Sequence, residues 1–223
     1  MALPSLVTIP LDEGFAPKSG CPVCRLQRMV ETRVIDFTSG SAMMEPDFRI
    51  LVNRHGFCEN HLNRLLTVGR RLSIALMLQS HLAELDTEIF TRKANEQERQ
   101  KRLNDCIVCR RVEESMTQLA RNIAVTFDRD SEFRVLVAAQ QTLCLPHYHR
   151  LMAAGKAHLN RKRYGDFGEI LTALCRGSLT GVRGEVDKFC AMFDYRNAEQ
   201  QNGAVNGAAL EEAALFLFGE NGR

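Results

Sequence analysis

The sequence lacks several features that would assign it to a common class of protein. No stretch of its 223 residues approaches the roughly 18 uninterrupted apolar residues of a membrane-spanning helix. The N-terminus lacks the basic start and long apolar run of a secretory signal. Neither sign of charge dominates, because 29 Lys and Arg residues are balanced by 27 Asp and Glu residues. With 45% hydrophobic residues the chain is not disordered, and we expect a folded cytoplasmic protein without a general affinity for nucleic acid.

Catalytic motifs are also missing. The sequence has no GxSxG nucleophile elbow, no HExxH zinc-protease motif, and no glycine-rich phosphate loop followed by Lys and Ser or Thr. The segment from Gly177 to Gly181 resembles a nucleotide-binding loop only superficially, since it has no lysine and no preceding strand. These absences favour a non-catalytic binding protein over an enzyme.

An internal duplication is the strongest signal that the sequence does contain. The CxxC pair Cys21 and Cys24 returns as Cys106 and Cys109, at an offset of 85 residues. The CxxH pair Cys58 and His61 returns as Cys144 and His147, at an offset of 86. Nine positions between residues 21 and 52 are identical in the shifted copy. The chain therefore consists of two versions of one design.

Each repeat carries the four ligands of a Cys3His zinc site. A CxxC or CxxH pair places two ligand atoms on the first turn of a helix or across a knuckle turn, where both can bind one ion. We predict two closed tetrahedral sites with two zinc ions per chain, on Cys21, Cys24, Cys58 and His61 and on Cys106, Cys109, Cys144 and His147. Pairing within a repeat is the simpler assumption, and pairing of each CxxC with the other repeat's CxxH is the alternative. Closed sites leave no position for a substrate, which makes the zinc structural.

Other interpretations of the cysteines remain open. An iron–sulfur cluster is chemically possible with Cys3His ligands. A thiol redox protein would cycle one of the CxxC pairs, although such motifs normally follow a strand in an alternating β/α chain. Cys175 and Cys190 would then assist as an accessory pair, and are otherwise buried core thiols. Disulfides would require an oxidising compartment and would leave both histidines without a role. His55 is a competing ligand for the first site, and His149 a hydrogen-bonding neighbour of the second.

The hydrophobic periodicity predicts a mainly α protein, a helical bundle built from two pseudo-repeats whose metal sites tie helix starts together. We divide the chain into an N-terminal arm (1–20), the first repeat (21–94), a charged linker or helix end (95–104) and the second repeat with extra helices (105–196). The last segment, 197–223, consists of a flexible linker and a short C-terminal helix at 208–218. An apolar stripe from Leu62 to Ile89 predicts one long helix of about eight turns that requires a partner helix. Glycines between 155 and 184 predict two or three helices with breaks.

One basic segment offers a further binding hypothesis. Arg161, Lys162 and Arg163 precede Tyr164, whose ring is available for stacking on a base. A solvated helix face is the simpler interpretation of the same residues.

Several motifs taken together are similar to an uncharacterised bacterial family, a domain of unknown function with duplicated CxxC and CxxH halves. They are the two CxxC pairs, the two CxxH pairs, the Ala42–Asp47 stretch, Gly56-Phe57 before Cys58, and Asp194-Tyr195-Arg196. The resemblance covers about residues 5–196 and implies no substrate, reaction or partner. We therefore expect a zinc-binding helical protein that acts as a scaffold for a partner protein or associates with itself.

Overall fold

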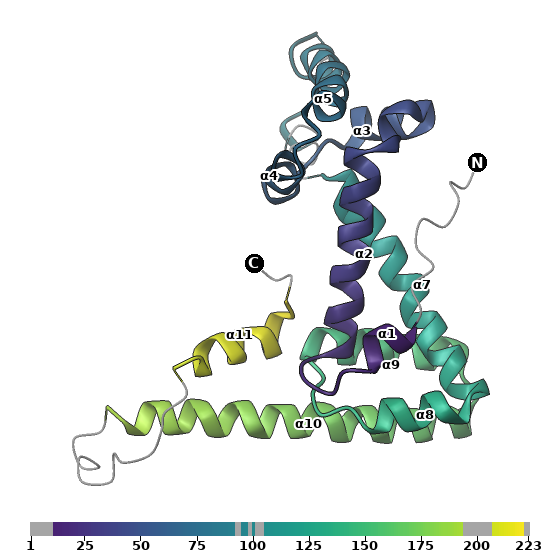
Figure 1. Ribbon diagram of the computed structural model, residues 1–223, viewed down its shortest axis with the longest axis vertical. Coiled ribbons are helices and arrows are strands. Elements are labelled where there is room, and N and C mark those ends of the chain that lie inside the picture. The colour runs from purple at the N-terminus through teal and green to yellow at the C-terminus, as the bar shows by residue number, and fades with distance from the viewer. Residues whose placement is uncertain (1–10, 92–94, 98–99, 101–104, 194–206, 221–223) are drawn as a thin grey trace. The chain divides into compact units, whose positions relative to one another are not determined.

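The computed structural model describes residues 11–91, 95–97, 100, 105–193 and 207–220. Every regular element within these residues is a helix and none is a strand, which confirms the predicted all-helical class (Figure 1). The repeated motifs each open a helix, as expected. The first half contains α1 (Leu11–Phe15), α2 (Pro22–Ser39), the 3-10 helix η1 (Ser41–Met44), α3 (Pro46–His55), α4 (Glu59–Thr67), α5 (Arg71–Asp86) and the π-helical turn η2 (Thr87–Thr91). The second contains α7 (Ile107–Arg129), α8 (Ser131–Ala138), α9 (Leu145–His158), α10 (Arg161–Ala191) and α11 (Ala209–Phe218).

The chain folds into two units that do not follow the two repeats. The described residues of the first unit lie within 29–117, and those of the second lie within 11–28 and 118–220. The first unit is therefore inserted into the second in chain order. Part of the predicted linker at 95–104, and the predicted linker from 197 to 206, lie outside the described residues, as does the late motif at 194–196.

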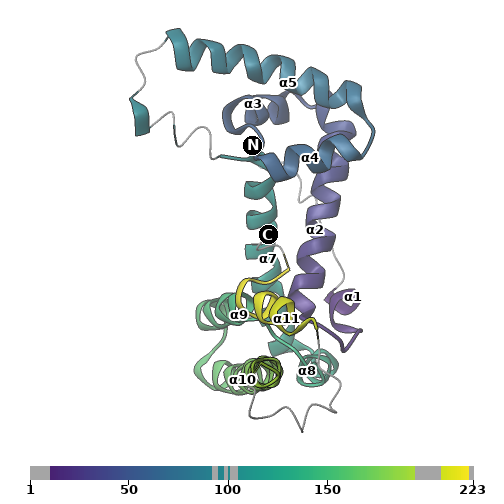
Figure 2. The ribbon, with the colours of Figure 1, turned by 90° about the vertical axis from the view of Figure 1, so that its left-hand side faces the viewer.

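The first unit is built around α3 and α5, which lie side by side with α4 (Figure 2). Pro46 opens α3 with a ring that suits the first helical turn, and Phe48 and Val52 are buried on its inner face, as their spacing predicts. The predicted long helix from Leu62 to Ile89 is wrong, because it divides into α4 and α5. Gly69 stands at the break with φ +83°, a left-handed conformation that ends a helix and that side chains disfavour.

Aromatic pairs and close helix contacts form the core of the second unit. Phe15 packs edge-on against Phe133, and Phe127 packs against Phe167 with ring centroids 4.7 Å apart. Gly155 allows α9 to approach α10, since a Cβ there would lie 2.8 Å from the Phe167 ring. Two helices, α9 and α10, are present as predicted, but the break between them falls at Leu159 and Asn160 rather than at a glycine. Helix α10 continues through its five glycines, and the predicted C-terminal helix is present as α11.

No helix in the described part of the chain combines the length and the apolar character needed to cross a membrane.

Candidate metal centres

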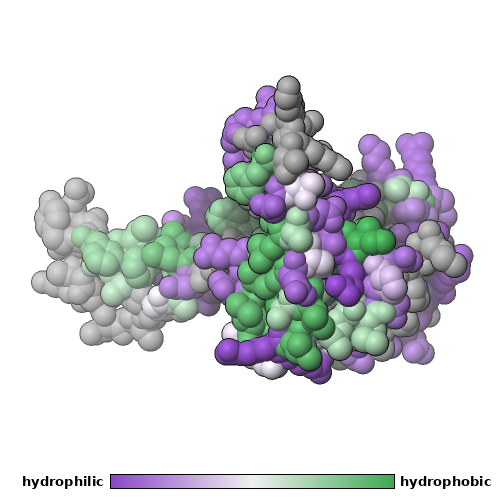
Figure 3. Space-filling view, turned by 90° about the horizontal axis from the view of Figure 1, so that it is seen from above, coloured by the Kyte–Doolittle hydropathy of each residue, from purple (hydrophilic) through white to green (hydrophobic). Residues whose placement is uncertain are grey.

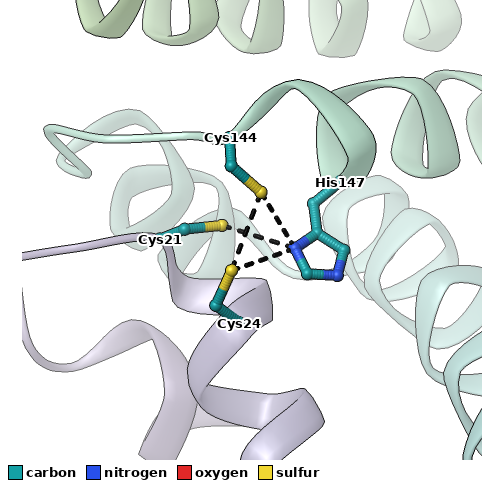
Figure 4. Close-up of side chains that lie close together, drawn as sticks. All are labelled: Cys21, Cys24, Cys144 and His147. Atoms are coloured by element: carbon teal, nitrogen blue, oxygen red, sulfur yellow. Dashed lines mark hydrogen bonds between the residues drawn. The ribbon is translucent and has the colours of Figure 1, made fainter. Parts of the chain in front are cut away.

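The eight predicted ligands gather into two clusters, and each cluster takes its CxxC from one repeat and its CxxH from the other. The first cluster joins Cys21 and Cys24 to Cys144 and His147 (Figure 4), and the second joins Cys58 and His61 to Cys106 and Cys109. Pairing within a repeat, the simpler assumption, is therefore wrong, and the alternative arrangement is the observed one. We call these the Cys144 cluster and the Cys58 cluster. All ligands of the Cys144 cluster lie in the second unit, and all those of the Cys58 cluster lie in the first.

The Cys144 cluster has the spacing of a single tetrahedral ion site. Zinc bound at 2.3 Å from sulfur and 2.0–2.1 Å from nitrogen separates two sulfurs by about 3.8 Å and a sulfur from the nitrogen by about 3.6 Å. The Sγ atoms of Cys24 and Cys144 are 3.7 Å apart. His147 Nδ1 lies 3.7, 3.3 and 3.1 Å from the Sγ atoms of Cys21, Cys24 and Cys144. The donor set therefore fits one metal ion without rearrangement of the backbone.

The Cys58 cluster repeats this geometry. The Sγ atoms of Cys58 and Cys109 are 3.9 Å apart. His61 Nδ1 lies 3.2 Å from both of these sulfurs and 3.5 Å from the Cys106 sulfur. In both clusters the four ligand atoms lie within 4.8 Å of one another. Two similar sites thus arise from the two crossed ligand pairs.

Four helix N-termini position the sulfurs. Cys21 and Cys106 directly precede α2 and α7, and each motif's second cysteine lies in the first turn of that helix. Cys58 and Cys144 occupy the N-cap positions of α4 and α9 with nearly identical backbone angles, φ −73° and ψ 160° against φ −75° and ψ 156°. The N-terminus of a helix stabilises negative charge, so each site surrounds its thiolates with favourable dipoles.

Each ligand histidine is oriented by a hydrogen bond on the side away from the sulfurs. His147 Nε2 lies 2.8 Å from the amide oxygen of Gln27, and His61 Nε2 lies 2.8 Å from a carboxylate oxygen of Glu31. Glu31 is buried and also pairs with the Arg64 guanidinium. When Nε2 carries the proton and donates it to these oxygens, the Nδ1 lone pair points at the three sulfurs. Such partners fix the tautomer and orientation that a metal requires.

Within a cluster, ionisation of one sulfur disfavours ionisation of the others. A hydrogen bond from Cys109 lowers the pKa of Cys106 to about 3, although burial opposes the shift. The same hydrogen bond to Cys106, together with burial and the charge on Cys106, raises the pKa of Cys109 far above its usual value. In the other cluster the interactions with Cys21 and Cys24, with burial, raise the pKa of Cys144 in the same way. A divalent ion supplies the positive charge that makes three adjacent thiolates stable.

The two clusters differ in how they are covered. All four ligands of the Cys144 cluster are buried, whereas Cys109 is exposed and Cys58 is half-buried. The turn after α11 closes the Cys144 cluster, because a Cβ on Gly219 would lie 3.7 Å from the Cys24 sulfur and 3.8 Å from the Cys144 sulfur. The Glu220 amide hydrogen-bonds Cys24, and its carboxylate lies 2.6 Å from Arg28 Nε. Gly219 and Glu220 provide this cover from 195 or more positions beyond the CxxC in sequence.

The remaining predicted residues lie outside both clusters. Cys175 is buried, as a core thiol should be, but Cys190 is exposed. Both lie on α10, where 15 residues span about 22 Å, so the two cannot form a disulfide within one chain. His55 is not a ligand, since its Nδ1 lies 2.7 Å from an Asp105 carboxylate oxygen. His149 is exposed beside the Tyr148 ring rather than bonded to the site.

The basic segment forms the first turn of α10. Arg161 and Lys162 are exposed there, while Arg163 Nε lies 3.1 Å from an Asp128 oxygen and its Nη1 lies 3.5 Å from an Asp166 oxygen. Part of the local positive charge is thus neutralised within the protein. Nucleic-acid binding by this segment stays a prediction.

Sequence reasoning missed the residues that support the ligands. Gln27 lies close in sequence to a ligand of its own cluster, three positions after Cys24. Glu31 does not, because it lies on α2, whereas the CxxC of the Cys58 cluster is at the start of α7. Gly219 lies beyond both repeats. No motif connects these residues to the ligands, because their contacts depend on tertiary packing rather than on spacing along the chain.

Comparison with known proteins agrees with the resemblance expected from the duplicated motifs. The profile of a family described as a family of unknown function, DUF6062, matches residues 3–220. No curated protein and no solved structure matches the chain. Since the match includes both repeats and α11, the chain belongs to the DUF6062 family along nearly its whole length.

Proposed function

We propose that the protein binds two zinc ions, one in each Cys3His cluster, and that these ions hold its fold together. The observation that carries this proposal is the spacing of the ligand atoms. In both clusters the histidine nitrogen lies 3.1–3.7 Å from all three sulfurs, and one pair of sulfurs is 3.7 or 3.9 Å apart, close to the edges of a tetrahedron around one zinc ion. The oriented imidazoles and the crowded thiols support it, since both arrangements are stabilised by a cation. Zinc joins the two ends of a long chain excursion at each site, so metal binding contributes directly to folding.

Zinc suits these sites better than an iron–sulfur cluster does. In a cluster of several irons the ligands are shared among different metal atoms, which requires wider spacing than a single ion does. Here each set of four ligand atoms converges within 4.8 Å. A closed set of three sulfurs and one nitrogen is a common environment of structural zinc.

The same closure favours a non-catalytic role. Four protein ligands complete a tetrahedral zinc ion and leave no position for water or substrate. Function then resides on the helical surface, as a scaffold that binds a partner protein or a second copy. All eight cysteines are free thiols in the structure, which supports the cytoplasm as the compartment.

Thiol redox chemistry at the Cys58 cluster is a second candidate function. The exposure of Cys109 favours it, because an accessible sulfur can meet an oxidant. Zinc itself would predict a stable thiol count, whereas redox cycling predicts a reversible change of two thiols per event. The separation of Cys175 and Cys190 removes the accessory pair from this scheme.

Metal analysis tests the proposal. Protein purified without a histidine tag or added metal should contain about two zinc ions per chain by plasma mass spectrometry and should be colourless. The double substitution Cys106→Ser and Cys109→Ser should lose one equivalent. The matched control, Cys175→Ser with Cys190→Ser, removes two sulfurs outside the clusters and should retain both ions.

Other results would contradict the proposal in distinguishable ways. Iron with absorption near 400 nm would indicate an iron–sulfur protein. Metal-free protein with a reversible thiol count would favour the redox candidate. Metal-free protein with disulfides would overturn both the zinc sites and the cytoplasmic placement.

A further inference from the structure

Helix α5 has an apolar face that the first unit does not cover. Ser73, Ile74 and Met77 are buried against the rest of the unit. The opposite face consists of exposed residues at helical spacing, namely Leu72, Ala75, Leu76, Gln79, Leu82 and Ala83. Leu72 is 70% exposed and Leu82 is 60% exposed. Figure 3 shows apolar residues, in green, gathered into a band on the face that is seen from above.

This face is unusual for a helix surface that meets water. Between Leu72 and Leu85 the only charged residue is Glu84. A surface helix normally alternates an apolar stripe with a charged one, and a helix that is apolar on both sides is covered on both sides. Phe90, beyond the end of α5 in η2, is also exposed, at 80%. The spacing at 72, 75/76, 79 and 82/83 is that of one helix packing along another, and Asp86 follows at the next position of this face.

The charges at the two ends of the stripe identify the partner. Arg71 begins α5 and Asp86 ends it, and both are exposed. Neither forms an ion pair with another side chain among residues 11–91, 95–97, 100, 105–193 and 207–220. When a second α5 runs antiparallel with Gln79 at the two-fold axis, residues whose numbers sum to 158 face each other. Leu76 then meets Leu82 of the second copy, and Ala75 meets Ala83. Asp86 meets Leu72, with Arg71 one position further along the helix.

We propose that α5 is a self-association surface on which two copies of this chain pair through antiparallel α5 helices. The arrangement is isologous, so each contact occurs twice. It buries the uncharged stripe, and it joins each basic helix start to an acidic helix end. Antiparallel helices also place opposite ends of the two helix dipoles together. This inference rests on the proposed scaffold function in one respect, namely that the protein binds a partner or a second copy of itself.

The size of the face sets the strength of the association. From Leu72 to Asp86 the contact face extends about 21 Å along a helix about 10 Å wide. That is smaller than the roughly 800 Å² per partner of a standard stable interface. We therefore expect a weak dimer that dissociates in the micromolar range, so that dimer and monomer are both measurable.

Sedimentation equilibrium of the zinc-containing full chain tests the proposal. From about 5 to 200 µM the average mass should rise from that of the 25.1 kDa monomer towards twice that value. Leu76→Glu with Leu82→Glu should raise the dissociation constant at least 50-fold. The two glutamates would face those of the second copy at the centre of the dimer, where they would also lie against apolar side chains. Val135→Glu is the matched control, since Val135 is 68% exposed on α8 in the other unit, and it should change the constant less than twofold.

Charge exchange tests the orientation. Arg71→Asp or Asp86→Arg alone should weaken the dimer at least fivefold, and the two together should restore it to within twofold. A protein that stays monomeric at 200 µM, a dimer that survives the double Leu substitution, or a double exchange that does not restore affinity each overturns the proposal. Zinc content measured on the same samples separates the outcomes. A wild-type chain that holds two zinc ions and stays monomeric refutes this surface alone, and a wild-type dimer without zinc refutes only the metal function.

Discussion

The two metal sites are expected to lose their ions at different rates. The Cys58 cluster presents the exposed Cys109 sulfur to water, whereas the Cys144 cluster is buried beneath the turn that contains Gly219. A chelator can attack the first cluster directly. It reaches the second only after the Gly219 turn opens, so zinc release should show a fast and a slow phase of equal amplitude.

The Gly219 turn also allows the slow phase to be changed selectively. Gly219 has φ 73° and ψ 176°, a region of backbone space that is essentially restricted to glycine. Replacing it by Ala costs about 1–3 kcal/mol of strain in the closed turn. Since about 1.4 kcal/mol is a factor of ten in population, the open turn becomes about 5- to 150-fold more frequent. The slow phase should accelerate by the same factor.

Stopped-flow release into a chromogenic zinc chelator measures both phases. Gly177→Ala is the matched control, because Gly177 lies inside α10 with nothing within 4 Å of an added Cβ and should leave both phases unchanged. A single phase for both ions, or a slow phase that ignores Gly219→Ala, would refute the idea that the C-terminal turn controls access.

Three further predictions follow from the site and the core. Gln27→Ala removes the hydrogen bond to His147 and should weaken zinc binding at that site about 10- to 100-fold in a chelator competition, with the other site unchanged; equal weakening at both sites would contradict the assignment. Acidification should release both ions, because protons compete with zinc for thiolate and imidazole, and affinity therefore falls as pH falls; zinc retained at pH 3 would argue against Cys3His ligation. Phe127→Ala should lower the free energy of unfolding by about 3–5 kcal/mol in urea titrations, since Phe127 is fully buried against Phe167; a loss below 1 kcal/mol would show that this core is not packed as described.

The local features of the site follow from the sequence, and the long-range ones do not. All eight ligands can be identified from the sequence, because the two members of each CxxC or CxxH pair are brought together within a single helical turn. Their crossed pairing depends on where four helices meet. No pattern along the chain distinguishes Cys24 beside Cys58 from Cys24 beside Cys144, because the two repeats have the same motif.

The errors in the helix predictions have a shared physical origin. Gly69 interrupts an apolar stripe that otherwise reads as continuous, and it breaks the helix because the chain there adopts a positive φ. Gly177 and Gly181 interrupt a less regular pattern, yet α10 continues through them. A glycine within a helix costs about 1 kcal/mol relative to alanine, which tertiary packing easily offsets. Whether a glycine ends a helix therefore depends on its tertiary surroundings and not on the residue type alone.

The crossed pairing also determines the order in which the sites become complete during synthesis. The Cys58 cluster lies entirely between Cys24 and Cys144 along the chain, so a ribosome releases its last ligand, Cys109, before either ligand of the second CxxH. The remaining 38 residues to His147 take roughly 2–8 s at typical elongation rates. A nascent chain can thus hold one ion before the other site exists. A cut between the repeats separates the CxxC from the CxxH of both clusters, so we expect neither half alone to form either observed site.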